Sequence, residues 1–227
     1  MTAHYRDAAR DALQTDMPPP PRGWAQRLYL AGGKRALDLV LCALIAPFAL
    51  LIVAGLAAVV AATGGHPFYA QQRVGRGGVP YRMWKLRTMV RDADDRLAAC
   101  LAACDATRAE WTSTQKLKND PRITRVGHLL RRSSLDEVPQ LWNVLRGEMS
   151  LVGPRPMLPD QQALYPGQAY YTLRPGITGL WQVSHRNASQ FADRAAFDAQ
   201  YHAEVSALLD LRVMLATVRV MARGTGY

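Results

Sequence analysis

The hydrophobic and polar pattern of the chain is dominated by one long apolar run. Residues 39–62 carry no charged side chain, which meets the length expected of a membrane helix. Pro47 splits the run, and helices over 36–46 and 48–62 would be about 16 and 22 Å long, each short of a bilayer core of about 30 Å. Basic residues flank both ends and no acid lies within 71–91, so both ends favour the cytoplasmic side. Two forms remain open: a helix broken at Pro47 that enters and leaves by one face, and a spanning helix that tolerates the proline.

Beyond this run the pattern predicts a mainly α-helical domain with a small β-hairpin and short strands, an α+β fold. Alternation around several glycines and a proline predicts the hairpin over 68–89. The composition of 92–117, with acids at its start, predicts a helix. A Pro-Gly turn at 175–176 leads into a strand-like run that ends at 183. Residues 189–222 are typical of two helices.

The second of these C-terminal helices is amphipathic. Its apolar positions recur three or four residues apart, at Leu208, Leu211, Leu215 and Val218. We favour packing of this stripe against its own domain over a position in the membrane interface.

Composition narrows the class of partner. The formal net charge of +10 and the pI near 9.9 indicate anionic partners such as nucleic acid, acidic phospholipid or phosphorylated small molecules. Three cysteines argue against a disulfide framework and indicate a reducing compartment. We expect a mobile N-terminal tail with a proline-rich linker over 1–33, a membrane segment over 34–63, a cytosolic domain over 64–222 and a C-terminal tail over 223–227.

Two adjacent acids, Asp136 and Glu137, lie in strongly basic sequence. Ser133 and Ser134 each precede an acid by three residues, the spacing of a helix capping box, so the pair could be an ordinary solvated helix start. The same position would also suit an anion site or a metal site. Pro139 lies too deep for an unstrained first turn, so the helix either begins later or is kinked. The surrounding arginines should keep both carboxylates ionised.

Six motifs follow one another along the chain: Lys34-Arg35-x-x-Asp38, Gln72-Arg73-Val74-Gly75, Trp84-Lys85-Leu86-Arg87-Thr88-Met89, Asp120-Pro121-Arg122-Ile123-Thr124-Arg125-Val126-Gly127, residues 134–156, and Arg174-Pro175-Gly176-Ile177-Thr178-Gly179. Together they resemble the bacterial sugar transferases, the monotopic phosphoglycosyl transferases that start exopolysaccharide and O-antigen assembly on undecaprenyl phosphate. The resemblance covers about residues 34–222 and is greatest to members that handle galactose or glucose.

This resemblance implies a re-entrant membrane helix broken at Pro47. It also implies a cytosolic catalytic domain with interfacial amphipathic helices, on the cytoplasmic face of the bacterial inner membrane. The implied reaction moves a sugar-1-phosphate, of hexose type, from a UDP-sugar to undecaprenyl phosphate and releases UMP. The implied partners are these two substrates and membrane phospholipid, with a homodimer and without nucleic acid.

The resemblance also assigns residues. Asp136 is implied as the nucleophile that forms a phosphosugar-aspartyl intermediate, and Glu137, beside Asp136, as the ligand of Mg²⁺. The cations implied on the phosphates are Lys85, Arg87, Arg155 and Arg174. Asp198 and Tyr201 match an Asp-x-x-Tyr pattern to which the sequence assigns no role. The chain departs from the family pattern at Leu86, Glu148 and His185.

Two non-enzymatic alternatives accompany this interpretation. A membrane-tethered nucleic-acid-binding regulator would account for the charge, although no recognition helix or aromatic stacking platform is evident. A scaffold of a polysaccharide complex would use the carboxylates only structurally.

Overall fold

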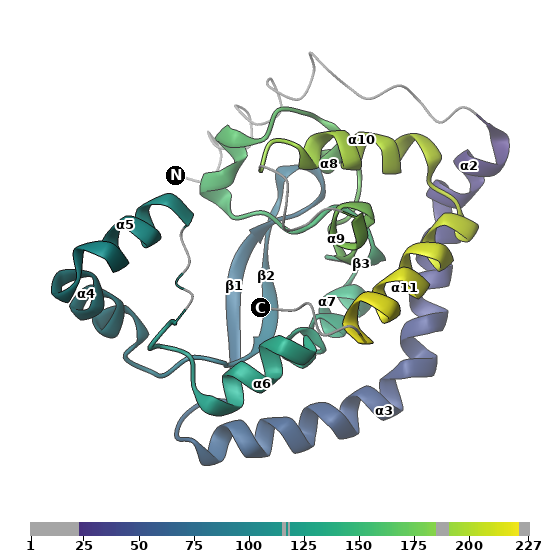
Figure 1. Cartoon of the computed structure of the whole chain (residues 1–227). Coiled ribbons are helices and arrows are strands. Elements are labelled where there is room, and N and C mark those ends of the chain that lie inside the picture. Colours follow the sequence, from purple (N-terminus) through teal and green to yellow (C-terminus); the bar gives the residue numbers. More distant parts are fainter. Residues whose placement is uncertain (1–22, 115–116, 118, 185–190, 223–227) are drawn as a thin grey trace.

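The N-terminal helix is longer than expected. The computed structural model describes residues 23–114, 117, 119–184 and 191–222. Helix α2 (Trp24–Leu28), a π-helical turn (Tyr29–Gly33) and α3 (Lys34–Ala62) follow one another without a break (Figure 1). The tail predicted over 1–33 is therefore helical from Trp24 onward, and Gln26 ties it to the domain by donating to the carbonyl of His202 over 3.0 Å. The expectations for 1–22, for 223–227 and for His185 lie outside the described residues.

Helix α3 passes through Pro47 without losing its helical assignment, but it is bent. Figure 1 shows it running past α11 (Ala207–Ala222) and then turning along the base of the domain beside α6 (Arg125–Ser133). Proline lacks the N–H for one helical bond and its ring crowds the preceding turn, which accounts for a bend. The segment Trp24–Ala62 is long and apolar enough to cross a membrane, and only 11% of its most apolar window is buried.

The rest of the described chain is mainly helical with short strands. Strands β1 (Phe68–Val74) and β2 (Pro80–Leu86) form the predicted antiparallel hairpin, with Phe68 opposite Leu86 and Val74 opposite Pro80. The helix predicted over 92–117 is two helices, α4 (Ala93–Ala103) and α5 (Asp105–Thr114), because Cys104 takes an extended conformation.

A second, parallel pair of strands joins distant parts of the chain. Strands β3 (Ser150–Val152) and β4 (Gly176–Thr178) pair through Ser150 with Gly176 and Val152 with Thr178. The strand-like run predicted up to residue 183 is strand only as far as Thr178, since α9 (Leu180–Ser184) follows at once. The two predicted C-terminal helices are α10 (Arg194–Glu204) and α11. Other helical segments are α7 (Gln140–Arg146), α8 (Ala169–Thr172) and three 3-10 segments, Arg76–Gly78, Leu135–Glu137 and Pro159–Leu164.

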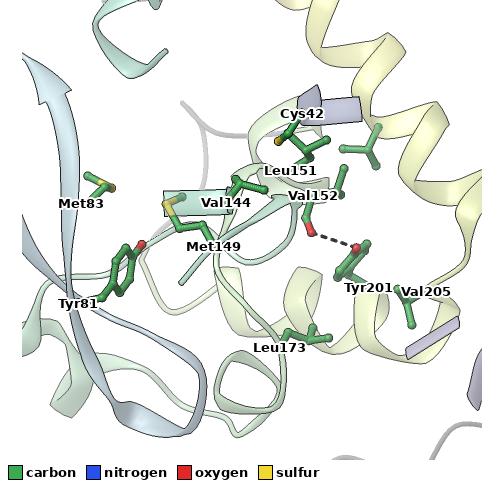
Figure 2. Packing of buried hydrophobic residues seen from close by; sticks show 11 residues of the cluster. Cys42, Tyr81, Met83, Val144, Met149, Leu151, Val152, Leu173, Tyr201 and Val205 are labelled. Carbon is green, nitrogen blue, oxygen red and sulfur yellow. Dashed lines mark hydrogen bonds between the residues drawn. The ribbon is translucent and has the colours of Figure 1, made fainter. Parts of the chain in front are cut away.

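The main hydrophobic core is formed where α3, α7, β2, β3 and the C-terminal helices meet. Figure 2 shows Cys42 of α3 beside Leu151, and the hydroxyl oxygen of Tyr201 of α10 facing the carbonyl of Val152 at 3.2 Å. Cys42 is fully buried, as expected of a packing residue. The first half of α3 is therefore part of the domain core, whereas Phe48, Leu50 and Leu51 beyond it are exposed.

The expectation that the α11 stripe packs inward is wrong. Leu208, Leu211, Leu215 and Val218 are 43–64% exposed, and Val213 is buried instead. The reason is Asp210, which is 1% exposed and bonded to Lys34 of α3. A charged pair buried at this position fixes which face of α11 turns inward, and helical spacing alone did not reveal it.

Candidate functional site

The two acids lie on a single 3-10 turn between two helices. Helix α6 ends at Ser133, its C-cap Ser134 has a left-handed φ of 56°, and Leu135–Glu137 form the turn. No capping box forms, since the Ser133 hydroxyl donates back to the carbonyl of Leu129 over 2.8 Å and the Ser134 side chain caps nothing. Helix α7 begins only at Gln140, with Pro139 as its N-cap, which confirms that the helix starts after the acids.

Lys85 of β2 joins the two acids. Its Nζ donates to Glu137 Oε1 over 2.6 Å and lies 3.7 Å from Asp136 Oδ2. The side chains of Asp136 and Glu137 are 10% and 28% exposed, so Asp136 is buried and Glu137 is partly open to solvent. The structure thus brings together three of the residues implied by the sequence.

The surroundings push the two carboxyl pKa values apart. Burial raises the pKa of Asp136, and the charge of Glu137 adds to this rise while Lys85 and Arg131 oppose it. Burial would also raise the pKa of Glu137, but Lys85, Arg155 and Arg73 together outweigh it and the pKa is lowered. The expectation that cations keep the acids ionised is thus supported for Glu137, whereas burial dominates at Asp136.

Arginine side chains gather near Glu137, since the charges of Arg155 and Arg73 help to lower its pKa. Arg155 is exposed and its Cζ lies 5.7 Å from the Trp181 ring centroid, while Arg194 lies 4.3 Å from the same ring. Burial and then Arg155 lower the pKa of Arg194 to about 10. Arg73 donates to the carbonyl of Pro156 over 3.2 Å, and its pKa is lowered by burial and Arg155. This excess of positive charge suits a multiply charged anion.

The other two cations implied by the sequence are bonded elsewhere. Arg174 donates through Nε to the carbonyl of Gly147 over 2.9 Å, at the C-terminal end of α7. Arg87 lies at the end of α3, where its Nη2 reaches the Val60 carbonyl at 3.3 Å and Thr63 Oγ1 at 3.4 Å. No contact joins Arg87 or Arg174 to either acid among the described residues.

Sequence reasoning missed Asn143, which holds the strand that carries Lys85. It is fully buried, accepts from the Trp84 N–H over 3.0 Å and donates to the Arg82 carbonyl over 2.7 Å. It also donates to Glu148 Oε2 over 2.6 Å. Asn143 therefore fixes β2 against α7, directly after the turn that carries the acids. An uncharged residue between apolar neighbours gave no sequence signal of this role.

Arg131 is one of the arginines in the basic sequence around the two acids. Its Nε donates to Thr88 Oγ1 over 2.9 Å, and its charge favours ionised Asp136. Helix α6 can approach this segment closely because Gly127 has no side chain: a Cβ there would collide with the Thr88 carbonyl. This explains the glycine that ends the motif Asp120–Gly127.

The Asp-x-x-Tyr pattern has a structural role here. Asp198 Oδ2 accepts from the Tyr165 hydroxyl over 2.8 Å, and both are buried. The Tyr201 hydroxyl donates to Asp210 Oδ1 over 2.6 Å and accepts from Lys34 over 2.8 Å. These contacts tie α10 to α3 and α11.

The two acids fit the ligand chemistry of Mg²⁺. This ion commonly takes one or two protein carboxylates and completes its shell with water and substrate phosphates. Glu137 and Asp136 supply such a pair, and the ammonium of Lys85 lies beside both oxygens, which marks the position as favourable for a cation. No group of three or more His, Cys, Asp or Glu side chains that could hold a metal gathers within the described ranges.

Comparison with known proteins now identifies the class. The bacterial sugar transferase family model matches residues 29–224, and this chain belongs to that family. It is therefore an enzyme, and the regulator and scaffold alternatives are set aside.

Several relatives are similar over most of the chain. The exopolysaccharide production protein ExoY of Sinorhizobium fredii is 44% identical over 199 residues, which cover 85% of this chain and 87% of the relative. The UDP-galactose-lipid carrier transferase of Erwinia amylovora is 44% identical over 195 residues, and the undecaprenyl-phosphate galactose phosphotransferase of Salmonella typhimurium is 43% identical over 195 residues. In both cases the match covers 85% of this chain but 41% of the relative, so the chain spans less than half the length of these two proteins.

Proposed function

We propose that this enzyme transfers a hexose-1-phosphate from a UDP-sugar to undecaprenyl phosphate and releases UMP, as the first membrane step of exopolysaccharide, O-antigen or capsule assembly. The observation that carries the proposal is the Asp136–Glu137 turn bridged by Lys85 and faced by an excess of arginines. The names of the relatives from Erwinia and Salmonella support a galactose donor and a lipid acceptor.

The reaction proceeds in two displacements at one phosphorus. A carboxylate oxygen of Asp136 attacks the sugar-bearing phosphorus of the UDP-sugar, the bond to the bridging oxygen breaks, and UMP leaves with the electron pair. Asp136 then carries an acyl phosphate to which the sugar remains attached. A phosphate oxygen of undecaprenyl phosphate attacks the same phosphorus, and the Asp136 carboxylate is regenerated as the lipid diphosphate sugar forms.

Charge decides whether a carboxylate can approach an anionic diphosphate. Lys85 lies 3.7 Å from Asp136 and would offset the two like charges as they meet. Arg73, Arg155 and Arg194 would hold the diphosphate and the departing UMP. Mg²⁺, held by Glu137 with Asp136, would supply Lewis-acid stabilisation of the phosphoryl oxygens.

Burial prepares Asp136 for this role. Its raised pKa reflects a carboxylate that is poorly solvated, and such an oxygen is a better nucleophile than one fully hydrated in water. Glu137, with its lowered pKa, stays ionised as a metal ligand requires. The two acids thereby receive separate tasks from their surroundings.

The proposal places the enzyme at the cytoplasmic face of the bacterial inner membrane, with α3 entering and leaving by that face. The bend in α3 supports this, as do the exposed apolar residues beyond Pro47. The exposed stripe of α11, Leu129 of α6 and Trp142 of α7 provide further apolar surface with which these helices could lie in the membrane interface. Cysteines placed at residues 30 and 66 should both be labelled from the cytoplasmic side; labelling from opposite sides would establish a spanning helix. The homodimer stays a prediction.

The test is UMP release by the purified full-length protein with a panel of UDP-hexoses, Mg²⁺ and undecaprenyl phosphate. We expect UDP-galactose or a related UDP-hexose to give UMP, and Asp136→Asn to lose turnover. Asp160→Asn, which changes an exposed acid on the 3-10 segment Pro159–Leu164, is the matched control and should retain activity. No UMP with any donor would overturn the proposal.

A further inference from the structure

A second cationic site lies at the C-terminal end of α3, outside the Asp136–Glu137 site. A cavity of about 320 Å³ opens between the end of α3 and the segment that follows β2. Its polar lining includes Thr63, Gly64, Arg87, Arg91, Arg96 and Thr124. Neither acid of the active site lines it.

The cavity carries more positive than negative charge. Asp92 is its one acidic lining residue, and Arg96 already engages it over 2.8 Å. No carboxylate pairs with Arg87 or Arg91 in the part of the chain that the structure describes. The Nε of Arg87 is buried and has no hydrogen-bond partner there. An unsatisfied buried guanidinium N–H is costly, which indicates that an acceptor is missing from this position.

The backbone is shaped to bring these two guanidinium groups together. Gly65 has a φ of +98°, and a Cβ at this position would lie 2.8 Å from Arg87 Nη1 and would collide with Arg91 Nε. Both guanidinium groups therefore occupy the space beside Gly65 that a side chain would fill. Two like charges held this close repel each other unless an anion lies between them, and a phosphate can accept hydrogen bonds from both.

The position of the cavity indicates where such an anion comes from. It adjoins the last turn of the apolar helix, where Val59 is 50% exposed and the uncharged run ends. With α3 in the bilayer, as the proposed function requires, this end lies at the level of the lipid headgroups. Arg87 and Arg91 would then face headgroup phosphates rather than the nucleotide.

We propose that Arg87 and Arg91 form a binding site for a lipid phosphate group, separate from the site that holds the UDP-sugar. Bilayer phospholipid and the polyprenyl phosphate acceptor share this chemistry. The inference rests on the proposed membrane position of α3. It places Arg87 on a lipid phosphate rather than on the phosphates of the UDP-sugar.

Native mass spectrometry of the purified full-length protein tests the site. The protein in detergent is titrated separately with phosphatidylglycerol, undecaprenyl phosphate and diacylglycerol, which lacks the phosphate. We expect one molecule of a phosphate-bearing lipid to be retained and diacylglycerol not to be. Arg91→Gln should weaken retention about tenfold or more, since it removes a charge-assisted hydrogen bond.

Two further variants keep the test decisive. Arg91→Lys preserves the charge and should restore part of the retention even if Arg91→Gln folds poorly. Arg132→Gln, at an exposed arginine of α6 outside the cavity, should leave retention unchanged. Selective retention of phosphatidylglycerol or of undecaprenyl phosphate would support the site and identify its source of phosphate.

Equal retention of diacylglycerol, or equal losses in Arg91→Gln and Arg132→Gln, would overturn the inference. UMP release separates this outcome from the proposed function. Wild-type protein that releases UMP but shows no phosphate-dependent retention overturns the lipid site alone. Protein that retains the lipid but releases no UMP overturns the catalytic proposal alone.

Discussion

The buried ion pair between Lys34 and Asp210 provides a quantitative test of how α3 is attached to the domain. Lys34 Nζ lies 2.6 Å from Asp210 Oδ2, and the two side chains are 9% and 2% exposed. The hydroxyls of Tyr29 and Tyr201 donate to the two carboxylate oxygens, both over 2.6 Å. Lys34→Met would leave a buried carboxylate with two neutral donors and no cation.

Removing one partner of a buried pair destabilises a protein by about 3–5 kcal/mol. Because both tyrosine donors remain, we expect Lys34→Met to fall near the lower limit, about 3 kcal/mol. For a chain of this size that lowers Tm by about 6–12 °C. Asp210→Asn should give a comparable loss. The double variant should lose about 1–2 kcal/mol less than the sum of the two single variants, since neither charge is then left unpaired.

Thermal unfolding in one fixed detergent, followed by circular dichroism, measures these values. The exposed pair Arg96–Asp92 is the control: its side chains are 49% and 51% exposed, so Arg96→Met should change stability by no more than about 0.5 kcal/mol. A Tm for Lys34→Met equal to that of Arg96→Met, or strict additivity in the double variant, would refute this reasoning.

Further predictions concern Asp198, Lys85, Arg174 and Ser134. Burial raises the pKa of Asp198 to about 7, above its unfolded value near 4. The stability linked to its proton is therefore present at low pH and is lost as pH rises to about 7. The Tm of Asp198→Asn relative to wild type should increase between pH 5 and 8, and a constant difference would contradict this. Lys85→Met removes the cation nearest Glu137, so UMP release should fall by about a hundredfold and the acidic limb of its pH–rate profile should move to higher pH. Arg174→Met should mainly lower Tm, with a smaller effect on turnover. Ser134 has φ of 56°, so Ser134→Gly should be tolerated while Ser134→Val should lower the free energy of unfolding by about 1–2 kcal/mol, as denaturant titration can measure.

Local signals in the sequence were sufficient for several elements. The glycines and proline between two alternating runs predicted the hairpin, which pairs from Phe68 with Leu86 to Val74 with Pro80. Pro139 left two possibilities, a helix that begins after the two acids or one that is kinked, and α7 begins at Gln140. These features depend on a few residues that are adjacent in the sequence, so local pattern is enough to predict them.

Contacts between distant segments could not be predicted from local pattern. Lys85 and Glu137 are 52 positions apart, and Arg194 reaches the same region from α10. The inward face of α11 depends on the pairing of Asp210 with Lys34, 176 positions away. Motif resemblance grouped Arg87 and Arg174 with the phosphates, which stays a prediction; local pattern did not show that both donate to backbone carbonyls at helix ends.

The central claim, that Asp136 is the nucleophile, is tested most directly by intact-protein mass spectrometry after rapid mixing with a UDP-hexose and Mg²⁺ in the absence of lipid acceptor. We predict that wild-type protein gains one hexose-phosphate, that the adduct maps to Asp136, and that undecaprenyl phosphate discharges it. Asp136→Asn should gain nothing. An adduct on another residue, or an Asp136→Asn variant that still becomes labelled and turns over, would contradict the account.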